Sequence, residues 1–194
     1  MPSDFSEYLD LQLHSSRLCL RVPDEDLLPV IHDYLLRNRL FLEPWTPRVR
    51  AEFYSAAFQH KKWQQEQIQM LQKRFFKLWI FARSDTRQQQ ALGQVSLSNI
   101  VWGGFRSCFL GYSIDAKANG QGYATEAIEA TVRFAFKQLK LHRIEANIMP
   151  RNLPSIRVVQ KLGFVCEGTS PKYLKINGVW EDHQHYVTRN LELE

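Results

Sequence analysis

The stretch that most constrains this chain is LGYSIDAKANGQGYATE, residues 110–126, where a β-strand pattern passes through a glycine-bearing turn directly into a helix. The first backbone N–H groups of a helix have no acceptor within it, and the helix dipole adds about half a positive charge there. Such a junction binds anions, and Gly120 and Gly122 would let phosphate oxygens approach the main chain closely. A glycine turn with nothing bound has the same local sequence, so the rest of the chain must decide.

Hydrophobic periodicity places this junction within one α/β domain. Helices are expected at residues 24–35, 123–139 and 154–162, and strands at residues 17–22, 75–82, 91–101, 105–114 and 143–149. Residues 51–74 fit one long helix or two short ones. Residues 38–47 contain two prolines and are expected to form a loop that exposes Phe41 and Trp45. Asn177-Gly178 predicts a hairpin between residues 173–176 and 179–188.

Length and composition exclude several classes of protein. At about 150 residues per domain, 194 residues favour a single domain over 1–194, with residues 1–16 as an N-terminal extension. No run approaches the roughly 18 apolar residues that span a bilayer, and the start carries no leader pattern, so we expect a cytoplasmic protein without a membrane partner. The net charge is +5, but Lys and Arg are spread along the chain, so no direct nucleic-acid role is expected. Cys19, Cys108 and Cys166 have no metal-binding spacing and are expected to be small buried side chains.

Three phosphate-binding motifs can be compared with residues 119–125. A nucleoside-triphosphate P-loop requires Gly-Lys before Ser or Thr, and that pair is missing from this position. A dinucleotide-binding G-x-G-x-x-G/A pattern begins at Gly120 but ends on Thr125, and a strand meander precedes it instead of repeated βαβ units. The dinucleotide interpretation is therefore the weaker alternative.

The third motif, [Q/R]-x-x-G-x-[G/A], is matched by Asn119, Gly122 and Ala124, with Asn in place of Gln or Arg. In this respect the chain resembles the GNAT superfamily of acetyl-CoA-dependent N-acetyltransferases. Further segments are similar to its bacterial ribosomal-protein-alanine N-acetyltransferases, and the likeness covers most of residues 17–188. These segments are residues 17–21, 38–47, 110–114, 162–164 and 167–168, Asn152 with Ser155, and the closing hairpin.

The resemblance implies a GNAT-like α/β (α+β) fold. Its mixed, mostly antiparallel sheet has helices on both faces and a splayed V between the fourth and fifth expected strands. Unpaired main-chain groups in the V would bind the pantetheine arm of acetyl-CoA as though it were a strand, and the glycine turn would bind its pyrophosphate. The residues implied in acetyl-CoA binding are Tyr112, Ser113, Ile114, Asn119, Gly120, Gln121, Gly122, Tyr123, Ala124, Thr125, Asn152 and Ser155.

Acetyl transfer needs a neutral amine, a polarised thioester carbonyl and a proton for the sulfur. A strand N–H near residues 112–114 is expected to polarise the carbonyl. The resemblance suggests that Ser155 protonates the departing thiolate. Asn152 or Ser155 could equally cap the following helix, and the sequence leaves both roles open.

The general base is harder to identify. In related enzymes that acetylate the ribosomal stalk protein, a glutamate fills the position of Leu174, which accepts no proton. The remaining candidates are Asp182, His183, His185 and Glu43. The histidine pair has the spacing of half a metal site but no evident third ligand, so no metal is expected.

An N-terminal α-amine needs less help than lysine, because roughly a third is neutral near pH 7.5 against about one part in a thousand for lysine. We therefore expect direct transfer to the N-terminal α-amine of a ribosomal protein, by a monomer or homodimer. The acceptor cleft is assigned to Phe41, Glu43 and Trp45. The alternatives are a small amine such as a polyamine or amino sugar, or a non-catalytic CoA-binding accessory protein.

Overall fold

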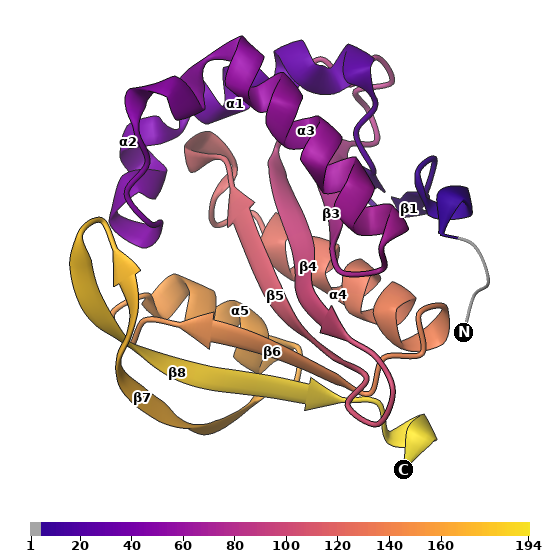
Figure 1. Ribbon diagram of the computed structural model, residues 1–194, viewed down its shortest axis with the longest axis vertical. Coiled ribbons are helices and arrows are strands. Elements are labelled where there is room, and N and C mark those ends of the chain that lie inside the picture. Colours follow the sequence, from indigo (N-terminus) through magenta and orange to yellow (C-terminus); the bar gives the residue numbers. More distant parts are fainter. Residues whose placement is uncertain (1–4) are drawn as a thin grey trace.

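The computed structural model describes residues 5–194, which form one sheet with strand order β1-β2-β3-β4-β5-β6-β8-β7 (Figure 1). Neighbouring strands are antiparallel, except that β5 and β6 are parallel. The strands are β1 (Gln12–His14), β2 (Leu18–Arg21), β3 (Phe76–Ala82), β4 (Gly93–Val101), β5 (Ser107–Ile114), β6 (Arg143–Ile148), β7 (Val165–Ile176) and β8 (Val179–Arg189). The expected mixed, mostly antiparallel sheet is confirmed.

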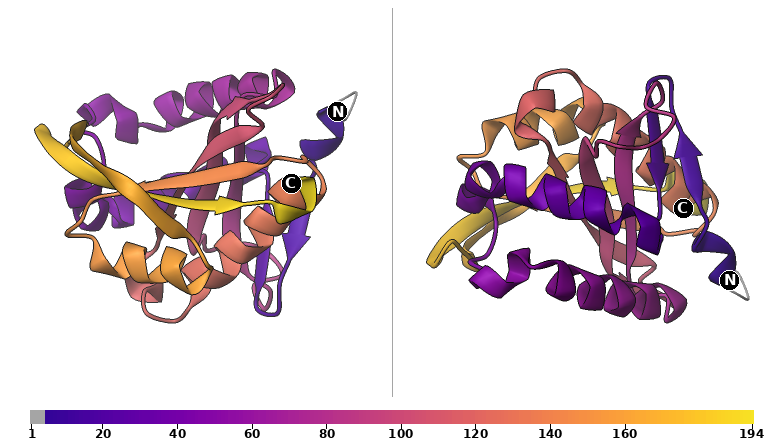
Figure 2. Two further views of the ribbon diagram at one scale, coloured as in Figure 1. Left: turned by 90° about the horizontal axis from the view of Figure 1, so that it is seen from below. Right: turned by 90° about the horizontal axis from the view of Figure 1, so that it is seen from above.

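Helices cover both faces of this sheet, as expected. Figure 2 (left) shows α4 and α5 on one side of it and the N-terminal helices on the other. The helices are α1 (Leu28–Arg37), α2 (Arg39–Leu42), α3 (Ala56–Leu71), α4 (Tyr123–Lys137) and α5 (Leu153–Lys161). Short 3-10 turns are η1 (Ser6–Tyr8), η2 (Glu25–Leu27), η3 (Glu43–Trp45), η4 (Ala51–Tyr54), η5 (Ala116–Ala118) and η6 (Leu191–Leu193).

The two helix layers explain why β3 is apolar almost throughout. Phe76, Leu78 and Ile80 pack into the larger core, which includes the buried face of α4. Trp79 and Phe81 point the other way, into a smaller cluster with α1. A strand that is buried on both faces has a continuous run of apolar residues, whereas a half-buried strand alternates between apolar and polar residues.

The splayed V lies between β5 and β6. Their parallel pairing spans residues 107–109 and 143–145, and the strands then diverge (Figure 1). From Ile144 to Ile148 β6 pairs with β8, while β5 continues to pair with β4 as far as Ile114. The C-terminal half of β5 therefore lies at the open side of the sheet.

The prediction of a loop at residues 38–47 was wrong. These residues form α2 and η3, with Asn38 buried at their start. The Asn38 amide donates to the Tyr34 carbonyl (2.9 Å) and to Asp115 (3.0 Å), and it accepts from the Ala116 N–H (2.9 Å). Pro44 occupies the first turn of η3, where the missing N–H of proline costs nothing, so it helps to start this turn.

The closing hairpin turns at Asn177-Gly178, both with positive φ, but its first strand is longer than predicted. We expected residues 173–176, and β7 begins at Val165. Irregular register along this exposed edge strand breaks the period-two pattern that would reveal it. Cys166 lies on this strand and is exposed, which corrects the expectation of three buried cysteines; Cys19 and Cys108 are buried.

The part of the expected N-terminal extension that the structure describes packs onto the domain. Phe5 and Tyr8 are buried in the main core, and Phe5 makes an edge contact with Trp102 at 5.9 Å between ring centroids. Across residues 5–194 no helix combines the length and apolar character that a membrane crossing requires.

Candidate active site

The glycine turn enters α4 as the sequence predicts. Gly120 has φ +76° and Gly122 has φ +81°, values that L-amino acids with a side chain rarely adopt. The Asn119 side chain folds back toward the end of β5, where its amide donates to the carbonyls of Asp115 (2.8 Å) and Ile114 (3.4 Å). Its side chain therefore fixes the turn against the end of β5. The first N–H groups of α4 are left for an anion.

A second feature of this turn escaped the sequence analysis. The Glu126 carboxylate accepts hydrogen bonds from the Ser15 hydroxyl (2.7 Å), the Ser16 hydroxyl (3.0 Å) and the Arg17 N–H (2.8 Å) and Nε (2.7 Å). Arg17 also donates to the Gln121 carbonyl (3.0 Å), and its guanidinium stacks on Tyr123. This contact between Arg17 and Glu126, the Arg17–Glu126 clamp, joins the start of β2 to the glycine turn at residues 119–124. Burial raises the pKa of Glu126, but these hydrogen bonds outweigh it and lower the pKa to about 2.

We expect Glu126→Gln to lower the free energy of unfolding by about 2 kcal/mol at pH 7, because the stabilisation that lowers the carboxylate pKa is lost. The folded-state pKa of about 2 lies below the ordinary 4.5, so this contribution is complete above about pH 4.5 and disappears as the pH falls towards 2. Urea unfolding at several pH values should therefore show the difference between wild type and variant shrinking over that window. The control is Glu129→Gln, because Glu129 is exposed on the same helix. An equal loss of unfolding free energy in Glu129→Gln would contradict a stabilising role of the clamp. So would a difference between wild type and Glu126→Gln that does not change with pH.

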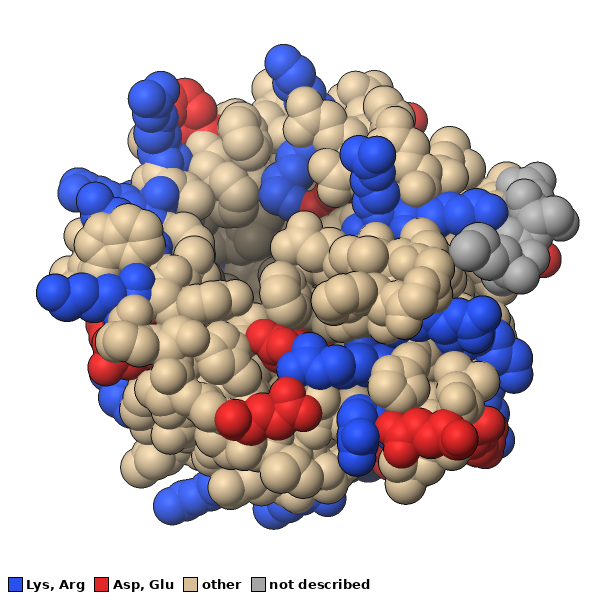
Figure 3. Space-filling view, turned by 60° about the horizontal axis from the view of Figure 1, so that its bottom comes forward, with Lys and Arg blue, Asp and Glu red and all other residues tan. Residues whose placement is uncertain are grey.

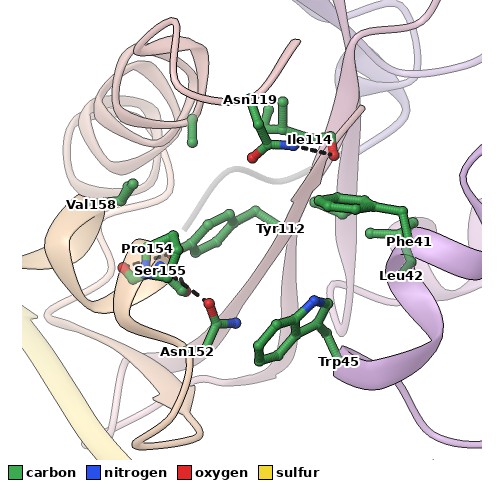
Figure 4. A pocket seen from close by; sticks show the side chains of 12 residues that line it. Phe41, Leu42, Trp45, Tyr112, Ile114, Asn119, Asn152, Pro154, Ser155 and Val158 are labelled. Atoms are coloured by element: carbon green, nitrogen blue, oxygen red, sulfur yellow. Dashed lines mark hydrogen bonds between the residues drawn. The ribbon is translucent and has the colours of Figure 1, made fainter. Parts of the chain in front are cut away.

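A cavity of about 220 Å³ lies beside this turn, in the gap between α2–η3 and the start of α5 (Figure 4). It contains seven of the residues assigned to acetyl-CoA, namely Tyr112, Ser113, Ile114, Asn119, Ala124, Asn152 and Ser155. Phe41, Leu42, Trp45, Pro154 and Val158 complete its wall. Gly120, Gln121, Gly122, Tyr123 and Thr125 do not line it; they form the turn and first turn of α4 next to it.

Within the cavity the Tyr112 hydroxyl lies 2.6 Å from the Ser155 Oγ, and Figure 4 shows the two side chains pointing toward each other. Asn152 caps α5: its Oδ1 accepts from the Ser155 N–H at 3.3 Å. Asn152 therefore supplies the capping oxygen of α5, and the Ser155 hydroxyl faces Tyr112. Burial raises the pKa of Tyr112 to about 12, with the hydrogen bond to Ser155 opposing it, so this phenol keeps its proton at neutral pH.

The aromatic segment, residues 41–45, closes one side of the cavity. Phe41 and Trp45 line this cavity, whereas Glu43 lines a neighbouring surface depression. The Arg151 guanidinium stacks over the Trp45 ring at 4.9 Å, donates to the Pro44 carbonyl (3.0 Å) and pairs with Glu181 (2.9 Å). Arg151 thus ties the aromatic segment to both β8 and the loop before α5.

A second cavity, of about 420 Å³, lies between strands β3–β5 and the helical layer of α1, α2, η4 and α3. It shares Leu42, Tyr112 and Ser113 with the first, so the two meet at β5 where the V opens. Ser113 is fixed by a hydrogen bond from the Tyr34 hydroxyl at 3.0 Å. Figure 3 shows one face of the molecule deeply hollowed, with Lys and Arg side chains at several places around the hollow.

The proposed general bases do not line either cavity. His185 lies on β8 with Nδ1 near Asn147 (2.5 Å) and Glu145 (3.1 Å) and with Nε2 2.8 Å from the Ser170 hydroxyl. Asp182 accepts from the Lys172 N–H at 2.8 Å, at the irregularity in β7. Their polar groups are therefore bound to other parts of the hairpin and β6. In the described part of the chain no three His, Cys, Asp or Glu side chains are grouped to hold a metal ion.

Comparison with known proteins identifies this fold. Residues 17–165 match the model of the acetyltransferase (GNAT) domain. The chain belongs to the GNAT acetyltransferase family. It is 44% identical over 147 residues to the probable N-acetyltransferase YjcK of Bacillus subtilis, covering 76% of this chain and 80% of that protein.

Two further relatives are named as enzymes that acetylate a ribosomal protein. The chain is 34% identical over 174 residues to the [ribosomal protein uS5]-alanine N-acetyltransferase of Escherichia coli, covering 89% of this chain and 88% of that protein. The crystal structure of the ribosomal-protein-S5-alanine acetyltransferase of Vibrio fischeri aligns with a TM-score of 0.89 and 32% identity, over 95% of this chain and all of that one. This GNAT protein is therefore an acetyl-CoA-dependent N-acetyltransferase related to ribosomal-protein N-acetyltransferases.

The site fits the acetyl-CoA that the family uses. Solved proteins of this fold include complexes with a CoA disulfide and with acetyl-CoA. In this chain the open space at Gly120 and the amides that begin α4 suit the pyrophosphate, since a Cβ at Gly120 would meet no atom within 4 Å. The cavity beside Tyr112 and Ser155 suits the pantetheine and acetyl group, which carry the thioester to be cleaved.

Proposed function

We propose that this GNAT acetyltransferase transfers the acetyl group to the N-terminal α-amine of a protein, with a ribosomal protein as its acceptor. The observation that carries the proposal is the junction of the two cavities at Tyr112 and Ser113. Acetyl-CoA would occupy the first cavity, and the end of a polypeptide would enter the second. The relatives that acetylate ribosomal protein uS5 support the same class of acceptor.

In this proposal Ser155 donates a proton to the departing thiolate and is reprotonated through its hydrogen bond to Tyr112. The proton that the amine loses on acetylation returns to this pair through water. Ser155 lies in the first turn of α5, where the helix dipole favours the negative charge that develops on sulfur. Backbone N–H groups of β5 near Ser113 polarise the thioester carbonyl. No strong base is needed, because roughly a third of an α-amine is already neutral near pH 7.5. A water relay takes up the proton that this amine loses when it becomes an amide.

Parallel reactions with four acceptors test this function. One peptide has an N-terminal alanine, one carries the same sequence with a blocked N-terminus and one lysine, one has an N-terminal serine, and the fourth acceptor is spermidine. We expect acetylation of either free N-terminus to exceed that of lysine by at least about tenfold at pH 7.5, because far more α-amine is neutral. Intact-mass analysis reports the product and thiol release reports the rate.

Two other outcomes would each contradict the proposed function. Faster acetylation of lysine or spermidine would replace the protein N-terminus with a side-chain or small-amine acceptor. Binding of acetyl-CoA without thiol release for any amine would indicate a non-catalytic CoA-binding protein.

A further inference from the structure

Three charged side chains in the second cavity have no part in the chemistry described above. The cavity wall includes Lys62 and Glu66 of α3 and Lys77 of β3. The Lys77 Nζ lies 2.7 Å from the Glu66 Oε1, and the Lys62 ammonium bonds the same oxygen. We call these three residues the lysine–glutamate cluster.

The cluster leaves positive charge facing the cavity. Together with Arg39, the lining carries three cationic side chains against the single carboxylate of Glu66. Burial raises the pKa of Glu66, but the charges of Lys77 and Lys62 outweigh it and lower the pKa, so Glu66 is ionised at neutral pH. The Lys77 side chain is largely but not fully buried; burial lowers its pKa to about 8, while Glu66 opposes this. A second carboxylate brought into the cavity would meet a poorly hydrated and only partly compensated ammonium group.

Strand register sets the distance from this cluster to the reaction site. Lys77 pairs with Ser96, and Ser96 pairs with Gly111 on β5, one residue before Tyr112. Two strand spacings separate the backbones of Lys77 and Gly111 by about 10 Å. An extended peptide advances about 3.3 Å per residue, so about three steps would cover the distance between the two backbones. The long Lys77 side chain and the acidic side chain of the peptide span part of it, which brings the second or third residue within reach.

The residues that pair in register between these two points are small. Gly111 has no side chain, and a Cβ there would meet the Ser96 Oγ at 3.1 Å. The small residues Ser96 and Gly111 therefore leave a path along the sheet from β5 towards Lys77.

We propose that the lysine–glutamate cluster is a carboxylate-recognition subsite of the acceptor cavity. It selects protein N-termini whose second or third residue is Asp or Glu. The inference rests on the proposed function, since it places a peptide in the second cavity with its α-amine at Tyr112 and Ser113. The acidic side chain forms charge-assisted hydrogen bonds with Lys62 and Lys77, in competition with Glu66.

The test compares three peptides that begin with Ala and differ only at the third residue, which is Glu, Gln or Lys, and a second series with the same changes at the second residue. We expect kcat/KM with acetyl-CoA to be about tenfold higher for the better Glu peptide than for its Gln counterpart, the scale of one charge-assisted hydrogen bond, and lowest for Lys. The preference should appear mainly in KM, because this contact is made before and during acetyl transfer alike.

Substitutions in the lysine–glutamate cluster test whether the cluster causes the preference for Glu over Gln peptides. Lys62→Gln should reduce the Glu-to-Gln ratio from about tenfold to about twofold, whereas Glu66→Gln should increase it by removing the competing carboxylate. The matched control is Lys61→Gln, an exposed neighbour on α3 outside the cavity lining, which should leave the ratio unchanged. Calorimetric titration with CoA verifies that each variant retains its folded cofactor site.

Several results would overturn the proposal. Equal kcat/KM for the Glu and Gln peptides, or a preference for Lys, refutes the subsite while leaving N-terminal acetylation intact. A ratio that survives Lys62→Gln, with only a lower melting temperature, makes the cluster a structural ion pair. Failure to acetylate any free N-terminus contradicts the proposed function itself and this inference with it.

Discussion

Replacing Gly122 with leucine is expected to raise the KM for acetyl-CoA by about 100-fold or more. Gly122 has φ +81° at the start of α4, a conformation that costs a residue with a side chain roughly 1–2 kcal/mol. A Cβ there would lie 3.4 Å from Nη2 of Arg17. The rest of the leucine would crowd the amides that begin α4, where we propose that the pyrophosphate binds. Both effects weaken the phosphate contacts, and steady-state kinetics together with calorimetric titration of CoA measures them.

Gly103→Leu is the matched control for this prediction. Gly103 has φ +73° in the exposed turn between β4 and β5, and a Cβ there would meet no atom within 4 Å. The control carries a similar backbone strain far from the cofactor site, so its melting temperature should fall while its KM for acetyl-CoA stays unchanged. An unchanged KM in Gly122→Leu would show that the turn at residues 119–124 does not bind the pyrophosphate.

Ser155→Ala is expected to lower kcat by about 100-fold, the lower end of what a positioned proton donor contributes. The Ser155 hydroxyl lies 2.6 Å from the protonated Tyr112 phenol, while Asn152 performs the capping. Removing the hydroxyl should therefore leave α5 and the affinity for CoA intact. Thiol release at saturating acetyl-CoA and calorimetric titration of CoA measure the two quantities separately.

Tyr112→Phe separates two possible pathways for the proton. If the phenol acts through the serine, kcat should fall by about tenfold, less than in Ser155→Ala, since a phenylalanine leaves the serine hydroxyl in place. A kcat within twofold of wild type in Ser155→Ala would instead assign protonation of the thiolate to solvent. A large loss of CoA affinity in that variant would make Ser155 a cofactor-binding residue.

The strand–turn–helix junction of β5 and α4 could be predicted from sequence because its signals are local. Period-two and period-3.6 patterns meet at two glycines, and each pattern is decided by residues within about one helical turn of each other. The same applies to the Asn177-Gly178 hairpin turn. The signals failed where local rules conflict with packing, as at α2, where buried Asn38 is held by Asp115 from a distant part of the chain.

The residues assigned to acetyl-CoA from sequence lie together around one cavity and the adjoining turn, whereas those assigned to catalysis and to the acceptor are spread over several places. The turn at residues 119–124 is one contiguous motif, whereas the walls of the second cavity come from α1, α2, η4, α3 and β3–β5. The two residues of the Arg17–Glu126 clamp are 109 positions apart in the sequence, so no short motif predicts their contact. Of the acceptor residues proposed from sequence, Phe41 and Trp45 lie in the first cavity and Glu43 lies outside it.

By itself the sequence determined the mixed α/β architecture, the glycine turn ahead of α4 and the likeness to GNAT enzymes, because these depend on hydrophobic period and on contiguous residue types. Only the tertiary structure decided that Asn152 caps α5 and so leaves the Ser155 hydroxyl facing Tyr112. It alone also placed Lys62, Glu66 and Lys77 on one cavity wall. Strand register and helix packing bring such groups together, and neither is fixed by the residues adjacent to them in the chain.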